Sequence, residues 1–413
     1  MKNIISERLG RINESPTLAI SAKATEMKAK GINVVDFGAG QLDFEIPEEM
    51  KKATINALNT KGIGKYTPVP GSAEMKKALC EMFKKEYKID YQPAEVMASS
   101  GGKHTIFNLF MSTINKGDEV IIPKPYWVSY PEIVSLAQGK NVFVETDDKF
   151  HIKADLIEEA ITPKTKFIII NSPSNPSGAV IEKSELKKIA DIAVEKDVFV
   201  MSDEVYAKLI YEGEHLSIAS LNEEIRKRTF TTGAFSKTFA IPGWRLGYLA
   251  GPTDVIKACT KYQSQSTSNT CSLVQQAMVN VLAMDNAFLE GWLSELKRKR
   301  DMVVKRLNEI EGVKCNTPEG AFYAFPKIPM KDDFTFSKEL LEEANVAVVP
   351  GEPFGMKGFI RMSYGGSDAS LESGLNRMEE FIGASACDDD SSEDEDEDLK
   401  ADLEAIRKLG KKK

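Results

Sequence analysis

The stretch SKTFAIPGWRLGY, residues 236–248, places a lysine beside a set of anion-binding groups. A lysine that attacks an aldehyde must be neutral, whereas the pKa of a free lysine is about 10.4. Burial, or a neighbouring cation such as Arg245, would lower the pKa of Lys237. Arg245 and the Ser236 hydroxyl could also grip a phosphate dianion, because a guanidinium offers forked donors and keeps its proton. The stretch therefore predicts a pyridoxal phosphate site.

The extended string resembles the lysine-bearing segment of the class I, fold-type I aminotransferases, in which Ser-Lys is followed by Gly-Trp-Arg-x-Gly-Tyr. The resemblance covers nearly all of residues 1–383. It implies a fold-type I α/β architecture with a mostly parallel central sheet, covering helices and a smaller α+β domain. Short apolar runs alternate with amphipathic segments such as 183–196, and this pattern independently favours a parallel sheet covered by helices.

Two polar motifs follow apolar runs that read as buried strands. NSPSNPSG, residues 171–178, follows one run, and SDEVY, residues 202–206, follows another. Ligands bind at the carboxyl ends of strands in open α/β sheets. By resemblance, Asn175 and Tyr206 contact the phenolic oxygen of the cofactor. Asp203 is expected to pair with the pyridine nitrogen, which makes the ring an electron sink.

Two further motifs complete the expected cofactor pocket. SSGGKH, residues 99–104, precedes a helical pattern, so the backbone N–H groups of Gly101, Gly102 and Lys103 are candidates for binding phosphate at a helix start. PKPYWVSY, residues 123–130, contains Trp127, which resembles the aromatic residue that stacks on the pyridine ring in this family.

An amino acid substrate must be held by its α-carboxylate. Arg361, in the β-like run GFIRMSYG, resembles the family's carboxylate-binding arginine, which makes a two-pronged pair. FGAGQLDFEIP, residues 37–47, resembles the segment whose glycine meets the same carboxylate, here Gly40, with Leu42 where proline is usual. Trp127 and Asn175 are expected to line the substrate pocket as well.

SPTLAISAKATEM, residues 15–27, and the GGK step resemble the bacterial aspartate aminotransferases of subgroup Ib. This resemblance implies that Lys103 and Thr17 recognise the far carboxylate of a dicarboxylic substrate. KYTPVPG, residues 65–71, resembles the segment whose tyrosine crosses a dimer interface to the neighbouring cofactor phosphate. Tyr66 would be that residue, in a homodimer with shared active sites.

The predicted function is a ping-pong transfer of an amino group between aspartate or glutamate and 2-oxoglutarate or oxaloacetate. Lys237 would join the cofactor and then carry the α-proton, while Asp203 stabilises electrons in the ring. A prephenate or aromatic amino acid aminotransferase on the same fold is the alternative, and β-elimination or decarboxylation would use the same lysine. A catalytically idle pyridoxal-binding regulatory module is disfavoured, because Lys237 and Asp203 are accompanied by both arginines, Arg245 and Arg361.

Composition points to a soluble enzyme of the reducing cytosol. Five cysteines form no Cys-x-x-Cys pair, and their odd number argues against a disulfide framework. We expect no signal peptide, membrane span or nucleic-acid partner. Three histidines without ligand spacing predict no catalytic metal.

By resemblance, residues 45–286 form a large pyridoxal phosphate-binding domain, and residues 1–44 supply an amino-terminal arm and part of a small domain that continues over 287–383. Residues 384–413 form an acidic tail. Nine acids within 388–398 account for the formal net charge of −8, since removing them leaves +1. The tail is expected to be disordered, with a short helix over 399–409, and either a solvated appendage or the site of an unknown partner.

Overall fold

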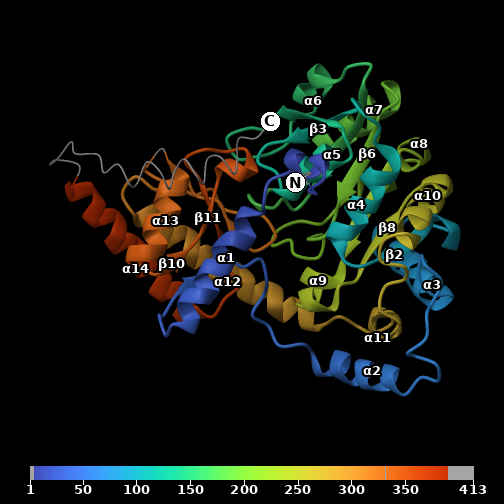
Figure 1. The fold of residues 1–413 in the computed structure, drawn as a ribbon, viewed down its shortest axis with the longest axis horizontal. Coiled ribbons are helices and arrows are strands. Elements are labelled where there is room, and N and C mark those ends of the chain that lie inside the picture. Colours follow the sequence, from blue (N-terminus) through green and yellow to red (C-terminus); the bar gives the residue numbers. More distant parts are fainter. Residues whose placement is uncertain (1–3, 331, 389–413) are drawn as a thin grey trace.

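The computed structural model describes residues 4–330 and 332–388, which form a large domain around a central sheet and a smaller domain beside it (Figure 1). The strands of the central sheet are β2 (Val96–Ser99), β3 (Glu119–Pro123), β4 (Lys140–Val144), β5 (Thr165–Asn171), β6 (Phe199–Asp203), β7 (Thr229–Ala234) and β8 (Gly247–Ala250). The expected α/β architecture is confirmed.

The sheet has the strand order β2-β8-β7-β6-β5-β3-β4. Its strands run parallel except β8, which is antiparallel to both of its neighbours. β3 and β5 are rich in valine and isoleucine, β6 begins with Phe-Val-Met, and all three are largely buried on both faces, as expected for central parallel strands. The prediction of a mostly parallel sheet is therefore confirmed.

Helices cover both faces of the sheet. The helices are α1 (Pro16–Ala29), α2 (Glu48–Leu58), α3 (Ala73–Met82), α4 (Gly102–Thr113), α5 (Ser129–Leu136), α6 (Ala154–Ala160), α7 (Lys183–Glu195), α8 (Glu223–Arg226), α9 (Phe235–Thr238), α10 (Thr253–Ser264), α11 (Ser272–Leu282), α12 (Phe288–Glu309), α13 (Asp333–Glu343) and α14 (Asp368–Asp388). α4, α5 and α10 share one core with the sheet, and α6 and α7 share another on the opposite face. α2, α3 and α11 pack beside β2 and β8.

α7 illustrates why these segments are helical. Its buried residues Leu186, Ile189, Ala190 and Ala193 recur at spacings of three and four, which gives one apolar stripe facing the sheet. The amphipathic helix predicted over 183–196 is thus confirmed. In the described part of the chain, no helix is long and apolar enough to cross a membrane.

The smaller domain combines segments from both ends of the sequence. β1 (Val35–Asp36) pairs in parallel with β10 (Val346–Ala347), and β12 (Ile360–Ser363) lies between β11 (Val349–Pro350) and β9 (Tyr323–Ala324). These strands share a core with α12, α13 and α14. Figure 1 shows α1 lying among these later elements.

The predicted domain limits fall between secondary-structure elements, with residue 45 between β1 and α2 and residue 287 at the start of α12. α14 continues to Asp388, past the predicted end of the small domain at residue 383. The rest of the acidic tail, including the helix expected over 399–409, lies outside the described residues.

Candidate active site

The ends of several strands bring the predicted site residues to one edge of the central sheet. β5 ends at Asn171 and β6 at Asp203, and these two residues are paired in register. β7 runs directly into α9, which carries Lys237. Because β8 runs in the opposite direction to β2 and β7, its amino-terminal end brings Arg245 to the edge where β2 ends at Ser99.

Lys237 is held in a position that favours its neutral form. Its Nζ donates to the backbone oxygen of Gly40 and lies 5.7 Å from the ring centre of Phe322. Burial, with smaller contributions from the charges of Arg361 and Arg245, lowers the pKa of Lys237 to about 8. The preceding Ser236 is buried. An amine with this pKa is a better nucleophile at neutral pH than a free lysine.

Asp203 lies at the base of the site. Its carboxylate accepts a hydrogen bond of 2.6 Å from the Tyr130 hydroxyl and one of 3.2 Å from the backbone N–H of Val205. Burial raises the pKa of Asp203 to about 6, against the lowering effect of the Tyr130 hydrogen bond. The carboxylate is therefore ionised at neutral pH and can pair with a cationic nitrogen.

Tyr130 was not singled out from the sequence. It follows Trp127 by three residues, and the two rings meet edge to face at 5.3 Å. Trp127 precedes α5, and the Tyr130 N–H donates to the Trp127 backbone oxygen at 3.0 Å, so the turn between them places both rings side by side.

Arg361 is buried at the junction of the two domains. Its Nη1 donates to Asn175 Oδ1 at 3.1 Å, and its Nη2 donates to the backbone oxygen of Gly38 at 2.8 Å. The guanidinium carbon lies 4.6 Å from the ring centre of Tyr323. Its Nε is buried and has no hydrogen-bond partner among the described residues. A buried guanidinium with a free donor is suited to bind a carboxylate.

Two neighbours of the site were not predicted from the sequence, Gly38 and Tyr323, and the predicted contact of Gly40 with the substrate carboxylate stays a prediction. Gly38 contacts Arg361, whereas Gly40 lies beside Lys237 and close to the Tyr323 hydroxyl. Tyr323 itself was missed. It belongs to β9, pairs with Ser363 of β12 and shares a 2.9 Å hydrogen bond with the predicted Tyr206.

An anion-binding cradle forms where β2 meets α4. Gly101 precedes α4 with φ of 90°, and a Cβ there would lie 2.2 Å from Nη2 of Arg245. Arg245 adopts a left-handed backbone, which is uncommon for a residue with a side chain, and its Nη2 donates to Ser100 O at 3.4 Å. The free N–H groups at the start of this 12-residue helix and the guanidinium together suit a phosphate.

Lys103 and Trp127 form a pair on the wall of the site. Lys103 Nζ lies 5.2 Å from the centre of the Trp127 ring. Burial, and secondarily the charge of Arg245, lowers the pKa of Lys103. The pair thus offers a ring face and a partly desolvated cation close together.

Among the described residues of the single chain, no hydrogen bond or ring contact joins Thr17 or Tyr66 to the side chains above. Thr17 lies in the first turn of α1, which packs against β11, the strand next to the one that carries Arg361. Tyr66 lies between α2 and α3, and its side chain is 91% exposed. Their predicted roles stay predictions. Within residues 4–330 and 332–388, no three His, Cys, Asp or Glu residues gather as a metal site.

Comparison with known proteins agrees with this arrangement. The family model described as aminotransferase class I and II matches residues 32–378. A probable aspartate/prephenate aminotransferase of Rickettsia bellii (strain RML369-C) is 43% identical over 398 residues, which cover 92% of this chain and 100% of that protein. An aspartate aminotransferase of Bacillus sp. (strain YM-2) is 41% identical over 392 residues, with coverage of 92% and 100%.

Solved structures give the same result. The structure of an aspartate aminotransferase from Thermus thermophilus with maleate has a TM-score of 0.88 and 39% sequence identity, covering 92% of this chain and 100% of that one. An aspartate aminotransferase from Rhizobium meliloti has a TM-score of 0.88 at 38% identity, covering 92% and 99%. The family resemblance seen in the sequence is confirmed: the chain belongs to the class I and II aminotransferases.

Proposed function

We propose that this protein is a pyridoxal 5′-phosphate-dependent aspartate aminotransferase. It exchanges the amino group between aspartate or glutamate and 2-oxoglutarate or oxaloacetate in two half-reactions. The proposal depends on two features that occur in the same site. The pKa of the Lys237 amine is lowered to about 8, partly by the charge of Arg361. The Arg361 guanidinium is buried, and its Nε has no partner among the described residues. Relatives named aspartate aminotransferase at 41% identity support the choice of substrate.

The residues present fit pyridoxal phosphate. The Gly101 cradle and Arg245 suit its phosphate. Only glycine leaves room for the guanidinium to lie against the backbone at residue 101, because a Cβ there would collide with it. Asp203 suits the pyridine nitrogen, and Trp127 offers a ring face close to Tyr130. When bound, the cofactor supplies an electron sink for the electron pair released at the α-carbon of the substrate.

Side chains of the protein bind the substrate and transfer its proton. Arg361 and Asn175 hold the α-carboxylate of the substrate and so orient the α-carbon. The Lys237 amine takes the α-proton and returns it, and a pKa of about 8 keeps this transfer possible near neutral pH. The Asp203 carboxylate would keep the ring nitrogen protonated, and the Tyr206 hydroxyl would hold the phenolic oxygen.

Lys103 supports a preference for dicarboxylic substrates. Its ammonium lies 5.2 Å from the centre of the Trp127 ring, where it would pair with the far carboxylate of a substrate bound beside that ring. Such a pair would offset the burial that lowers the pKa of Lys103. Thr17 is the second predicted contact. Prephenate is a dicarboxylate too, and the name of the Rickettsia relative makes it the second candidate substrate.

Exposed side chains support a homodimer. Tyr66 is 91% exposed, and Ile55 and Leu58 on the neighbouring α2 are 59% and 57% exposed. Apolar surface of this kind is stabilised when a second copy covers it. Tyr66 would then reach the phosphate site of the neighbouring copy.

The test is a comparison of substrates on the purified holoenzyme. Aspartate with 2-oxoglutarate should give oxaloacetate and glutamate, and the absorbance of the cofactor should respond to aspartate alone. Glutamate with prephenate tests the second candidate. Conversion of neutral amino acids alone, with aspartate and prephenate both inert, would refute the proposed substrate class, and a Lys237→Ala variant with full activity would refute the mechanism.

A further inference from the structure

The turn between β4 and α6 is fixed by hydrogen bonds to one side chain, and it faces the small domain. Asp147 Oδ1 accepts hydrogen bonds from the backbone N–H groups of Lys149 at 2.9 Å and His151 at 2.8 Å. Phe150, between them, has φ of 68°, in the left-handed region. The carboxylate of Asp147 therefore fixes an unusual backbone path, which turns Phe150 and His151 toward the small domain.

Apolar and polar contacts join this turn to the small domain. The Phe150 ring packs edge to face against Phe325 at 5.7 Å and Phe359 at 5.8 Å. Asn316 Nδ2 donates to the backbone oxygen of Asp148 at 2.7 Å. The turn is thus part of the surface on which the two domains meet.

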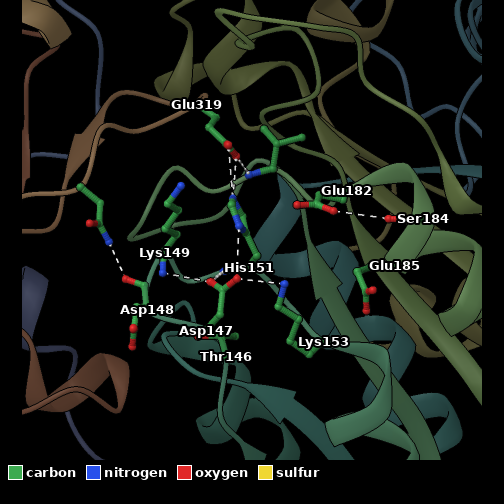
Figure 2. A network of polar contacts seen from close by, with 12 residues as sticks. Thr146, Asp147, Asp148, Lys149, His151, Lys153, Glu182, Ser184, Glu185 and Glu319 are labelled. Atoms are coloured by element: carbon green, nitrogen blue, oxygen red, sulfur yellow. Dashed lines mark hydrogen bonds and ion pairs between the residues drawn. The ribbon is translucent and has the colours of Figure 1, made fainter.

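Glu319 forms the centre of this contact (Figure 2). Its backbone N–H donates to Gly178 O at 3.1 Å, and its carboxylate accepts from the Val180 N–H at 2.7 Å. His151 Nε2 lies 3.2 Å from both of its carboxylate oxygens. A Cβ on Gly178 would lie 2.6 Å from Pro318 Cβ, so the two segments touch without spare room.

His151 is placed between two carboxylates. Its Nδ1 lies 3.5 Å from Asp147 Oδ2, and its Nε2 lies 3.2 Å from Glu319 Oε2. Neutral imidazole can donate from only one ring nitrogen, whereas imidazolium donates from both. The hydrogen bond to Glu319 is the main cause that raises the pKa of His151, and the charges of Glu319, Asp147 and Glu182 add to it against burial.

Other charged groups surround His151 and its two carboxylate partners. Lys153 Nζ lies 2.9 Å from Asp147 Oδ2 and shares that carboxylate with His151. Lys149 stands close enough to Glu319 for its charge to act on that carboxylate. The charges of Glu182 and Glu185 also act on Lys153, and Figure 2 shows Glu185 beside Lys153 and Glu182 above it. Asp147 is thus already partly neutralised by a lysine, which leaves Glu319 as the stronger partner of a protonated His151.

Both segments joined by Glu319 lead directly to Arg361. The loop that ends at Val180 carries Asn175, whose Oδ1 accepts from Arg361 at 3.1 Å. The strand that follows residue 320 carries Tyr323, whose ring centre lies 4.6 Å from the guanidinium. A shift of either segment would move a direct neighbour of the guanidinium.

We propose that His151 and Glu319 form a proton-dependent clamp that positions Asn175 and Arg361 for the carboxylate of the substrate. The inference rests on the proposed role of Arg361 in binding that carboxylate. Neither His151 nor Glu319 touches the substrate, so both are positioning residues. Because the pKa of His151 is raised, the clamp is complete below the ordinary histidine pKa of about 6.5 and weakens as the pH rises through the raised value.

The first test measures the titration of His151 in the holoenzyme by NMR, with isotope-labelled histidine. The chain has only three histidines, so a His151→Gln variant assigns the resonance. We expect a pKa above about 6.5, and a further increase when succinate, an unreactive dicarboxylate, saturates the site. The increase follows because coupling between proton and ligand is reciprocal. A His151 pKa that succinate leaves unchanged would overturn the clamp.

The second test is the pH dependence of steady-state kinetics. For the wild type, KM for aspartate should rise by about fivefold or more across the His151 transition, while kcat changes less. His151→Gln and Glu319→Gln should both lose this component, whereas the titration of Lys237 is common to all variants. Asp148→Asn is the matched control, because it removes a carboxylate from the same turn that points away from His151 in Figure 2.

The outcomes separate the two proposals. A wild type that fails to convert aspartate contradicts the proposed function. An active wild type whose pH profile persists unaltered in both His151→Gln and Glu319→Gln contradicts the clamp alone. Loss of the profile in Asp148→Asn as well would also contradict it, because any change in the turn would then have the same effect.

Discussion

Lys237 should be unusually reactive in the cofactor-free protein. The pKa of Lys237 is lowered to about 8 from an ordinary 10.5, first by burial and then by the charges of Arg361 and Arg245. At pH 7, a pKa of 8 leaves roughly one amine in ten neutral, whereas a pKa of 10.5 leaves roughly one in three thousand. Lys237 should therefore hold about 300 times more neutral amine than an ordinary lysine.

The perturbation that tests the origin of this shift is Arg361→Gln. Removing the positive charge that contributes most should raise the pKa of Lys237 above 8, but the pKa should stay well below 10.5, because burial is the larger cause. Arg245→Gln should act in the same direction and more weakly. Competitive acetylation of the cofactor-free protein with trace isotopic reagent, over pH 6 to 11, followed by mass spectrometry of the peptide that contains Lys237, measures each pKa.

The reasoning would be refuted by a wild-type midpoint close to 10.5. It would also be refuted if the pKa of Lys237 fell in the Arg361→Gln variant, because loss of a neighbouring positive charge can only favour the protonated amine. Exposed lysines in the same digest, such as Lys65, provide the internal reference.

Three further predictions concern the rest of the site. Arg361→Lys loses the forked donors to Asn175 and Gly38. The kcat/KM for aspartate should fall roughly 30- to 1,000-fold, which corresponds to about 2–4 kcal/mol of lost binding energy, and most of the change should be a rise in KM. Gly101→Ala places a Cβ 2.2 Å from Arg245 Nη2, so equilibrium dialysis should show weaker pyridoxal phosphate binding, and an unchanged affinity would contradict the cradle. Asp203→Asn removes a carboxylate whose folded pKa of about 6 lies above the ordinary 3.8, so its ionised form destabilises the fold as the pH rises. Urea unfolding of the cofactor-free variant should show a gain of up to about 3 kcal/mol at pH 7–8 that shrinks toward pH 4, together with loss of transamination.

The sequence predicted those parts of the site that follow local patterns. Asn175 and Asp203 could be placed because each follows an apolar run, and the two runs are parallel neighbours in the sheet. Lys237 and Arg245 lie in one continuous motif. The direction of β8 could not be read from its four residues, although it is this antiparallel course that brings Arg245 to Gly101.

The residues that the sequence did not reveal depend on long-range packing. Tyr323 reaches Arg361 only because β9 pairs with β12, and Tyr130 reaches Asp203 across 73 positions in the sequence. His151 belongs to a turn with no recognised motif, and its meaning depends on Glu319, 168 positions away. The roles of Tyr66 and Thr17 require a second chain or a bound substrate, so they stay predictions.

The pairing of β1 with β10 has a consequence for how the protein is made. Val35 meets Val346, and Asp36 meets Ala347, so this pair of strands cannot form until residue 347 of the 413 has left the ribosome. The strands and helices between α2 and α11 can assemble earlier, since domains fold as units during translation. A nascent chain therefore carries its first apolar segment without a partner through most of its synthesis, which makes that segment a natural contact for a ribosome-bound chaperone.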